Sequence, residues 1–333
     1  MTDTVGKTVA PATAGGGQPP KLKRKAGGRL ECELGLVLGA LGLAASRLGQ
    51  LWIAFDVFSQ FTLQFAVVAL GFLAGRVMRR ARLLVAFVCI VLGFVGIGAW
   101  PIVASDHPRA LDVAAEGERA LTVASFNTFY DNPNTAAVQA EIERLDADII
   151  TLIELGPNTR GLLTALEGRY PYHADCFATD YCNMAVLSKL PIASSEARVG
   201  WDGPPTLIAT LGPEAGDLMV FGVHTIRFPH AKTQFRQVNA LAQFISTIPN
   251  RKLVMGDFNA TPFSRITSAI VAQTGLQRLT NLPTWPARLQ LPQVAIDHIF
   301  VSPGLRQLET EKIGNPAGSD HFPITLKLAV PLN

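Results

Sequence analysis

Charged side chains are scarce in this 333-residue sequence, where they make up 17% of the residues, whereas soluble globular domains carry about 25%. Because 48% of the residues are hydrophobic, part of the chain must lie in lipid or be deeply buried. Cysteine is also sparse: the four cysteines include no Cys-x-x-Cys pair, which excludes a disulfide scaffold and a zinc ribbon. The 29 glycines and 22 prolines are an ordinary share, which excludes collagen-like and low-complexity sequences.

The net charge of +3 is divided unequally along the chain. Residues 1–110 contain twelve Lys/Arg and five Asp/Glu, a net charge of +7, and residues 111–333 contain seventeen and twenty-one, a net charge of −4. Proteins that bind duplex nucleic acid usually present a basic face to its phosphates. The acidic C-terminal part therefore disfavours nucleic acid as a partner, although a local basic patch would restore it.

The N-terminal third predicts a membrane region. Residues 1–29 are polar, and their composition predicts a disordered, basic, cytoplasmic tail. Three apolar segments follow within residues 30–105, at about 34–55, 57–75 and 83–105. About 20 apolar residues cross a bilayer as a helix, so we expect three transmembrane helices. Two spans are the alternative, because Arg47 lies in the first segment and a mid-span arginine costs about 2.5–3.5 kcal/mol.

Positive charges set the expected orientation. They cluster from Lys21 to Arg29 and from Arg76 to Arg82, and both stretches are therefore predicted to be cytoplasmic. Three spans then place the linker, residues 106–119, and everything after it on the outer face of the cell inner (plasma) membrane, periplasmic or extracellular. Two spans would leave that part in the cytoplasm. On the outer face, Cys176 and Cys182 can close a small disulfide loop, and two unpaired thiols are the alternative.

A second domain, residues 120–330, is predicted where the periodicity changes. Its short apolar runs predict strands at 121–126, 148–153, 185–188, 206–211, 218–224, 253–256, 295–301 and 325–330, and its amphipathic runs predict helices at 136–145 and 233–247. Many short strands with few helices between them predict an α/β fold with a two-layered sheet core flanked by helices.

Polar residues able to bind a metal ion or a phosphate stand at the edges of these strands. Five of them stand where strands end: Asn127, Glu154, His224, Asp257 and Asp297. Asp320 and His321 precede the last strand in the same way. One acidic residue at a strand end is most often a turn or a cap. Six such positions in one domain predict side chains that meet at one rim of a sheet.

The motifs around these positions carry a family resemblance. They are Val-Ala-Ser-Phe-Asn127, Ala-Asp-Ile-Ile-Thr-Leu-Ile-Glu154, Asn-Met-Ala-Val-Leu-Ser-Lys189, Phe-Gly-Val-His224, Met-Gly-Asp257-Phe-Asn259-Ala-Thr-Pro, Ile-Asp297-His298-Ile-Phe and Gly-Ser-Asp320-His321-Phe-Pro-Ile. With these motifs in this order, the domain resembles the endonuclease/exonuclease/phosphatase superfamily, which consists of DNase I-like metal-dependent phosphoesterases. Thr284-Trp285-Pro286 looks like its membrane-anchored bacterial subgroup. The resemblance implies a four-layer α/β sandwich, here preceded by N-terminal transmembrane helices.

The chemistry of phosphoester hydrolysis assigns the first roles. Attack by water needs a Lewis acid, a base and donors for the developing negative charge. Glu154 is the best metal ligand, because a hard carboxylate suits Mg²⁺. The resemblance places Asn127 and Asp320 beside the ion, for which Mn²⁺ is the alternative. Asp257 would orient and deprotonate the water.

The remaining candidates would bind the phosphate. The resemblance implies that Asn259 donates to it and that Asp297 holds His321 in the cationic form. His224 would contact the phosphate or protonate the leaving oxygen. His298 is a further candidate for substrate binding, and a strand histidine that satisfies its own backbone is the alternative.

We therefore expect a metal-dependent hydrolase of phosphoric ester bonds. Phe129 and His224 replace an acidic residue and a tyrosine of the DNA-repair branch, which disfavours abasic-site repair. The expected substrate is a phosphodiester, such as a phospholipid or another lipid-linked phosphate. The bilayer is the expected partner, and no obligate protein partner is readable. The alternatives are an extracytoplasmic endo- or exonuclease and, in another class, a catalytically silent membrane protein that binds phosphorylated ligands.

Overall fold

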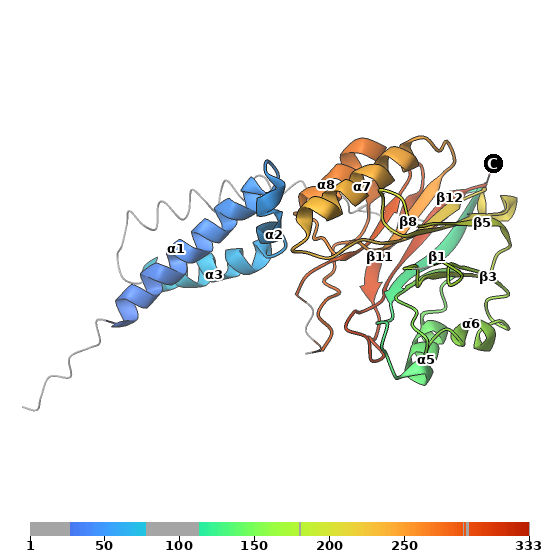
Figure 1. The fold of residues 1–333 in the computed structure, drawn as a ribbon, viewed down its shortest axis with the longest axis horizontal. Coiled ribbons are helices and arrows are strands. Elements are labelled where there is room, and N and C mark those ends of the chain that lie inside the picture. Colours follow the sequence, from blue (N-terminus) through green and yellow to red (C-terminus); the bar gives the residue numbers. More distant parts are fainter. Residues whose placement is uncertain (1–26, 78–112, 180, 289, 291–292, 333) are drawn as a thin grey trace, which may run out of the picture.

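The computed structural model describes residues 27–77 and 113–332, except 180, 289, 291 and 292. These residues form two parts (Figure 1), which we call the N-terminal hairpin, residues 27–77, and the C-terminal domain, residues 113–332. The third predicted apolar segment, 83–105, and nearly all of the predicted tail lie outside the described residues.

The N-terminal hairpin consists of two antiparallel helices and a short turn. Its elements are α1 (Gly27–Leu48), η1 (Ile53–Phe55), α2 (Asp56–Ser59) and α3 (Thr62–Val77). Leu36, Ala40 and Leu43 of α1 are buried against Ala69 and Leu73 of α3. The two helices approach closely at Gly39, where a Cβ atom would lie 2.9 Å from the backbone nitrogen of Ala69.

The helix boundaries differ from the two predicted segments. The first helix ends at Leu48 rather than 55, and the second segment is interrupted between Ser59 and Thr62. No single helix among the described residues is long and apolar enough to cross a membrane. The pair Ile53–Ser59 and Thr62–Leu73, which is bent by 59°, meets the length and composition requirements together.

The C-terminal domain contains two six-stranded sheets. The first is built from β1 (Glu118–Asn127), β2 (Ile149–Ile153), β3 (Tyr172–Asp175), β4 (Ala185–Ser188), β11 (Arg306–Ile313) and β12 (Ile324–Pro331), in the order β11-β12-β1-β2-β4-β3. The second is built from β5 (Ile192–Arg198), β6 (Thr206–Leu211), β7 (Met219–His224), β8 (Lys252–Asp257), β9 (Gln277–Arg278) and β10 (Asp297–Val301), in the order β5-β6-β7-β8-β10-β9.

Helices cover the outer face of each sheet, so that four layers result (Figure 1). The helices are α5 (Thr135–Leu145), α6 (Leu162–Ala165), α7 (Ala231–Ser246) and α8 (Arg265–Thr274), with η2 (Pro213–Ala215) in a loop. Apolar side chains fill the space between the two sheets. Separate clusters join the first sheet to α5 and α6 and the second sheet to α7 and α8. The predicted four-layer α/β sandwich is therefore confirmed.

Strand pairing brings the predicted site residues to one end of the sheets. β1 and β2 are parallel, with Asn127 beside Ile153, the residue before Glu154. β7 and β8 are also parallel and end on the neighbours His224 and Asp257. β10 begins opposite the end of β8, because it is antiparallel to that strand.

The turn of the N-terminal hairpin is docked on the start of α8. The buried carboxylate of Asp56 accepts hydrogen bonds from Ser264 Oγ at 2.6 Å and from the backbone N–H of Arg265 at 2.7 Å. Gln60 Oε1 accepts from the Thr261 N–H at 2.7 Å. The bond from Arg265 satisfies a backbone donor that the start of α8 would otherwise leave unpaired, and all three bonds connect the two parts of the chain.

Candidate active site

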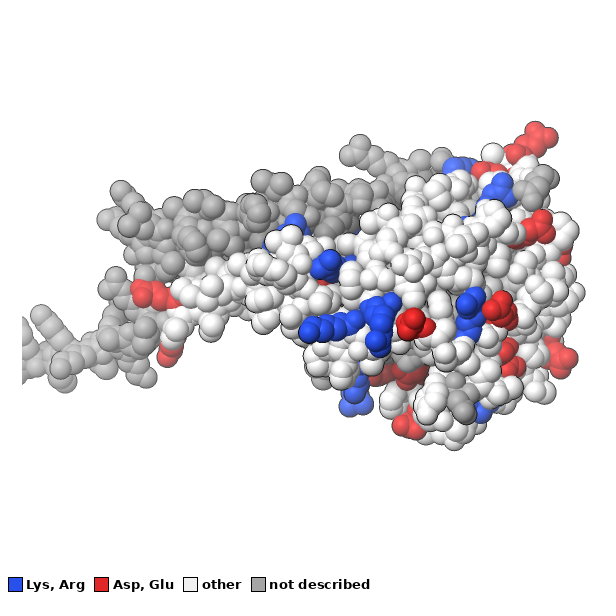
Figure 2. All heavy atoms as spheres, turned by 45° about the horizontal axis from the view of Figure 1, so that its top comes forward, with Lys and Arg blue, Asp and Glu red and all other residues white. Residues whose placement is uncertain are grey.

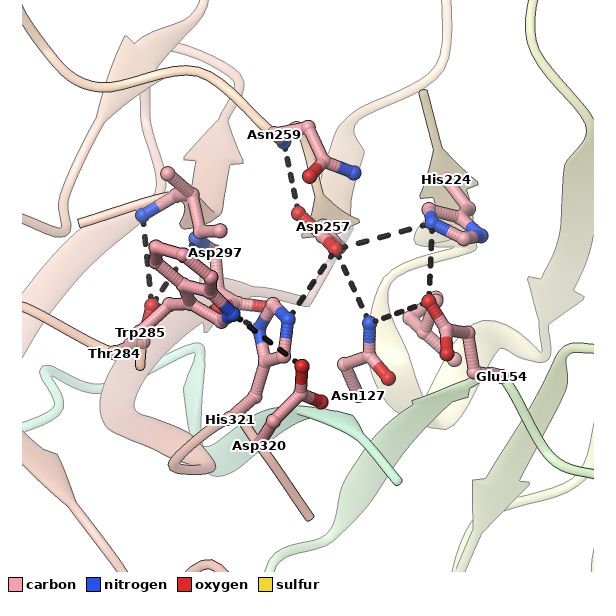
Figure 3. Close-up of polar contacts among 12 residues, drawn as sticks. Asn127, Glu154, His224, Asp257, Asn259, Thr284, Trp285, Asp297, Asp320 and His321 are labelled. Carbon is pink, nitrogen blue, oxygen red and sulfur yellow. Dashed lines mark hydrogen bonds and ion pairs between the residues drawn. The ribbon is translucent and has the colours of Figure 1, made fainter. Parts of the chain in front are cut away.

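A pocket of about 790 Å³ opens where the ends of β1, β2, β7 and β8 meet. Its walls include most of the predicted site residues, from both sheets, and Figure 3 shows these side chains pointing toward one another. The walls also include the loop of Phe228 and the exposed Tyr181.

Asn127 links the two sheets through its amide. Its Nδ2 donates to Glu154 Oε1 and to Asp257 Oδ2, each at 3.1 Å. Its Oδ1 accepts from the Phe129 N–H at 3.0 Å. Glu154 Oε2 accepts from the Tyr130 N–H, so that Glu154 Oε1 faces the pocket centre (Figure 3).

Asp257 lies at the centre of the group and is 1% exposed. Burial raises the pKa of Asp257 to about 8, although the nearby His321 opposes this shift. Gly256 precedes it at a φ of +149°, where a Cβ atom would collide with the Val223 carbonyl oxygen. This close approach of β7 and β8 holds Asp257 Oδ2 3.8 Å from His224 Nε2.

His224 also approaches Glu154, with 3.5 Å between its Nε2 and Glu154 Oε1. Burial lowers the pKa of His224, against the opposing charge of Glu154. A histidine that is neutral at neutral pH can exchange a proton with a ligand in the pocket.

His321 is held in a hydrogen-bonded chain of buried side chains. Its Nδ1 donates to Asp297 Oδ2 at 2.8 Å, and Thr284 Oγ1 donates to the same oxygen at 2.6 Å. Burial alone would lower the pKa of His321, but the charges of Asp297 and Asp257 and this hydrogen bond raise it to about 10. His321 is therefore cationic at neutral pH, with its Nε2 3.7 Å from Asp257 Oδ2.

Asp320 and Asn259 occupy opposite sides of the pocket (Figure 3). Asp320 Oδ2 accepts from the indole N–H of Trp285 at 3.3 Å. Asn259 Nδ2 donates to the Thr225 carbonyl at 3.0 Å, and its backbone N–H donates to Asp257 Oδ1 at 2.8 Å. Since an amide nitrogen carries two hydrogens, Asn259 retains one for a ligand.

His298 is the exception among the predicted site residues. It is fully buried between Phe258 and Phe300, where its Nε2 lies 2.8 Å from the Ala260 carbonyl and its Nδ1 lies 3.3 Å from Thr280 Oγ1. Burial, together with the charge of Arg278, lowers its pKa to about 3. The structure contradicts a role for His298 in substrate binding and favours the alternative of a histidine satisfied by its own surroundings.

The acidic side chains of the site fit a divalent cation. Ligand atoms of Glu154, His224 and Asp257 lie within 4.8 Å of one another, as do those of Asp257, Asp297 and His321. Asp297 Oδ1 is buried without a hydrogen-bond partner among the described residues. Hard carboxylate oxygens are the ligands that Mg²⁺ and similar ions prefer. A cation would relieve the repulsion between carboxylates that contributes to the raised pKa of Asp257.

Two positioning residues were not assigned a role from the sequence. They are Thr284 and Trp285, which lie in the loop before β10. Thr284 donates a hydrogen bond to Asp297, and Trp285 donates one to Asp320. Only the resemblance of Thr284-Trp285-Pro286 to one subgroup drew attention to them, because loop residues carry no periodic signal. Together these contacts orient a histidine and a carboxylate toward the pocket.

The site combines a buried carboxyl of raised pKa, a cationic histidine and a cluster of metal-binding oxygens. This combination is suited to metal-assisted hydrolysis of an ester that carries negative charge, since it offers a base, a proton donor and compensation for the charge.

Comparisons with known proteins agree with this class. The model of the Endonuclease/Exonuclease/phosphatase family matches residues 124–321. No curated protein matches the chain by sequence. Several solved structures share its fold. A family protein from Bacteroides thetaiotaomicron is 17% identical, with 64% of this chain and 98% of the other covered and a TM-score of 0.51.

Two further structures have named activities. Sphingomyelinase C from Streptomyces griseocarneus is 17% identical, with 63% and 99% covered and a TM-score of 0.50. A mannosyl-6-phosphatase from Bacteroides thetaiotaomicron is 16% identical, with 62% and 99% covered and a TM-score of 0.50. At these identities the likeness concerns the fold alone.

The family match spans more than half of the chain, so the chain belongs to the endonuclease/exonuclease/phosphatase family. It is accordingly a metal-dependent hydrolase that acts on phosphoric ester bonds.

Proposed function

We propose that the protein is a membrane-anchored, Mg²⁺-dependent phosphodiesterase that hydrolyses a phospholipid or another lipid-linked phosphate on the outer face of the membrane. One observation carries the proposal: the apolar N-terminal hairpin is docked beside the active-site pocket. Phe61 of the hairpin lies edge-on against Phe228, with 6.0 Å between ring centroids, and Phe228 lines the pocket.

The hairpin surface supports a lipid partner. Large apolar side chains are more than half exposed on both helices, including Leu38 and Leu41 of α1 and Val67 and Leu70 of α3. In Figure 2 the described surface of the hairpin is almost entirely white, and charged side chains gather over the C-terminal domain and at the outer end of the hairpin. An apolar surface of this extent is typical of membrane or protein contact.

The docking also supports the predicted orientation. Because the turn of the hairpin contacts residues 261–265, the C-terminal domain belongs on the same side of the bilayer as that turn. In the expected topology, the positive-inside rule assigns the basic stretches Lys21 to Arg29 and Arg76 to Arg82 to the cytoplasm, and the turn with the C-terminal domain to the outer face. The disulfide between Cys176 and Cys182 is consistent with an oxidising compartment.

The residues of the pocket would divide the reaction as follows. Glu154 and Asp320 would hold the metal ion, with Asn127 beside it, and the ion would polarise the phosphoryl group and offset negative charge. Asp257 would take the proton of the attacking water, because its carboxylate lies at the centre of the group, 3.8 Å from His224 Nε2 and 3.7 Å from His321 Nε2. His321, which is cationic, would donate to a phosphoryl oxygen, and the neutral His224 would donate a hydrogen bond to the phosphate.

A substrate panel tests the proposal. Full-length protein in detergent micelles would be incubated with phospholipids, oligonucleotides and bis-p-nitrophenyl phosphate, each with Mg²⁺ and with EDTA. We expect Mg²⁺-dependent hydrolysis of the chromogenic diester and of at least one phospholipid. Hydrolysis of oligonucleotides but of no lipid would favour the extracytoplasmic nuclease, and binding without any hydrolysis would favour the silent phospho-ligand protein.

Reporter fusions test the orientation separately. Alkaline phosphatase fused after Asn333 should be active and green fluorescent protein at the same position should be dark, because the former needs an oxidising compartment and the latter a cytoplasmic one. The reverse pattern would place the active site in the cytoplasm and favour an intracellular substrate.

A further inference from the structure

A second cavity, of about 190 Å³, lies between α3 and the C-terminal domain. Its apolar walls are formed by Leu63, Pro262, Phe263, Pro283, Val294 and Ala295. An apolar cavity of about 150 Å³ is large enough to bind benzene, so this one has room for a run of several methylene groups. We call it the α3 cavity.

One side of the α3 cavity continues into an exposed apolar surface. Leu63 lines the cavity and is also 52% exposed. Val67 and Leu70 follow it at helical spacing and are 70% and 53% exposed. Residues four and seven positions apart lie on one face of a helix. An apolar stripe therefore runs along α3 into the cavity.

Its other side adjoins the active-site pocket. Three segments of chain contribute to both spaces: Thr261, Pro283 and Ala295 line the cavity, and Asn259, Trp285 and Ile296 line the pocket. Each pair is separated by at most two residues, or roughly 7 Å of extended chain. The two spaces share no lining residue, but their walls lie within the length of one extended lipid molecule.

The cavity is preformed because hydrogen bonds fix its walls. Gln60 Oε1 binds the Thr261 N–H, and Thr261 Oγ1 donates to the Ser59 carbonyl at 3.1 Å. Gln64 Nε2 donates to the Gln293 carbonyl at 2.9 Å on the opposite wall. A rigid apolar wall needs no rearrangement when a chain enters, which lowers the free-energy cost of binding.

Two polar atoms in these walls have no hydrogen-bond partner among the described residues. They are Gln64 Oε1 and Asn281 Nδ2, an acceptor and a donor, both buried. Both atoms have almost no accessible surface, so the cavity wall that a ligand would meet is mainly apolar.

We propose that the α3 cavity binds the hydrocarbon chain of the lipid whose phosphate occupies the active-site pocket. This inference rests on the proposed function, and it assigns the choice of substrate to the interface between the hairpin and the C-terminal domain. The hairpin is then a part of the substrate-binding site as well as an anchor.

The test compares two chromogenic diesters, hexadecyl p-nitrophenyl phosphate and methyl p-nitrophenyl phosphate, with full-length protein in mixed micelles. Burial of one methylene improves binding about fourfold, so the wild type should prefer the hexadecyl ester by at least about tenfold in kcat/KM. Leu63→Glu should lower this preference by about tenfold, and so should Leu63→Trp, which fills the cavity without adding charge. Leu51→Glu is the matched control, because Leu51 is 66% exposed and does not line the cavity, and it should keep the preference.

The inference is overturned if the wild type shows no preference, or if Leu51→Glu lowers it as much as the Leu63 variants do. Loss of hydrolysis of both diesters would contradict the proposed function instead. A readout that is independent of hydrolysis separates the two cases. A hexadecyl phosphate carrying a terminal diazirine should crosslink to peptides containing residues 60–64, 261–263 or 293–295, and labelling confined to other peptides would overturn the inference.

Discussion

Thr284→Val removes one hydroxyl from the chain of buried side chains that positions His321, at nearly constant volume. Thr284 and Asp297 are both buried, 2.6 Å separates their oxygens, and Asp297 Oδ1 has no partner among the described residues to compensate. A hydrogen bond to a charged group contributes about 1.5–3 kcal/mol. Asp297 acts on the reaction through His321. If the lost hydrogen-bond energy raises the free energy of the transition state by this amount, kcat falls by about ten- to hundredfold.

The assay is Mg²⁺-dependent hydrolysis of bis-p-nitrophenyl phosphate by the full-length protein, with Thr280→Val as the matched control. Thr280 is equally buried and its hydroxyl accepts from the Ile299 N–H at 3.0 Å, but it faces His298 rather than the site. The control should lower the melting temperature with little change in kcat.

A double-variant cycle separates positioning from general destabilisation. In the His321→Ala background, Thr284→Val should have no further effect on kcat, because the residue through which it acts is gone. An equal fall in kcat in both backgrounds, or no fall in the wild-type background, would refute the reasoning.

Two further predictions concern the same group of residues. Asp257→Asn and His321→Ala should each lower kcat by about 10²–10³-fold, far from additively because both act in one step, and Asp297→Asn should cost less; near wild-type kcat in either of the first two variants would remove its assigned role. In EDTA, the melting temperature should fall as the pH rises from about 7 to 10. In the folded protein, burial raises the pKa of Asp257 to about 8. Burial alone would lower the pKa of His321, but the charges of Asp297 and Asp257 raise it to about 10. The unfolded chain has largely released both protons by about pH 7, so the stability that these protons give the folded protein is lost as the pH rises. A melting temperature that stays flat or rises, measured by scanning fluorimetry, would contradict these shifts.

Much of the site could be predicted because it stands at strand ends. Parallel strands bring their carboxyl ends to one edge, and this places Asn127 near Glu154 and His224 beside Asp257. The alternation of side chains along a strand could also have excluded His298 from the predicted substrate-binding residues. Adjacent residues on a strand point to opposite faces, so Asp297 and His298 could not both face the pocket.

Other features leave no local trace in the sequence. The edge strands β5 and β11 were not predicted, because their half-exposed polar residues lack a clear alternation. Asp56 reads as an isolated charge in an apolar stretch, yet it caps α8 some two hundred residues away. Such contacts are decided by tertiary packing. Therefore the docking of the hairpin, and with it the α3 cavity, could only be found in the structure.

A Mg²⁺ titration tests the central claim, metal-assisted hydrolysis at this site, most directly. Hydrolysis of bis-p-nitrophenyl phosphate would be followed for the full-length wild type and for Glu154→Gln, first in EDTA and then with increasing Mg²⁺. The account predicts no activity in EDTA, recovery of the wild type with Mg²⁺, and for Glu154→Gln a higher Mg²⁺ requirement and a lower kcat, because one hard ligand is lost. Full activity of either protein in EDTA would contradict it.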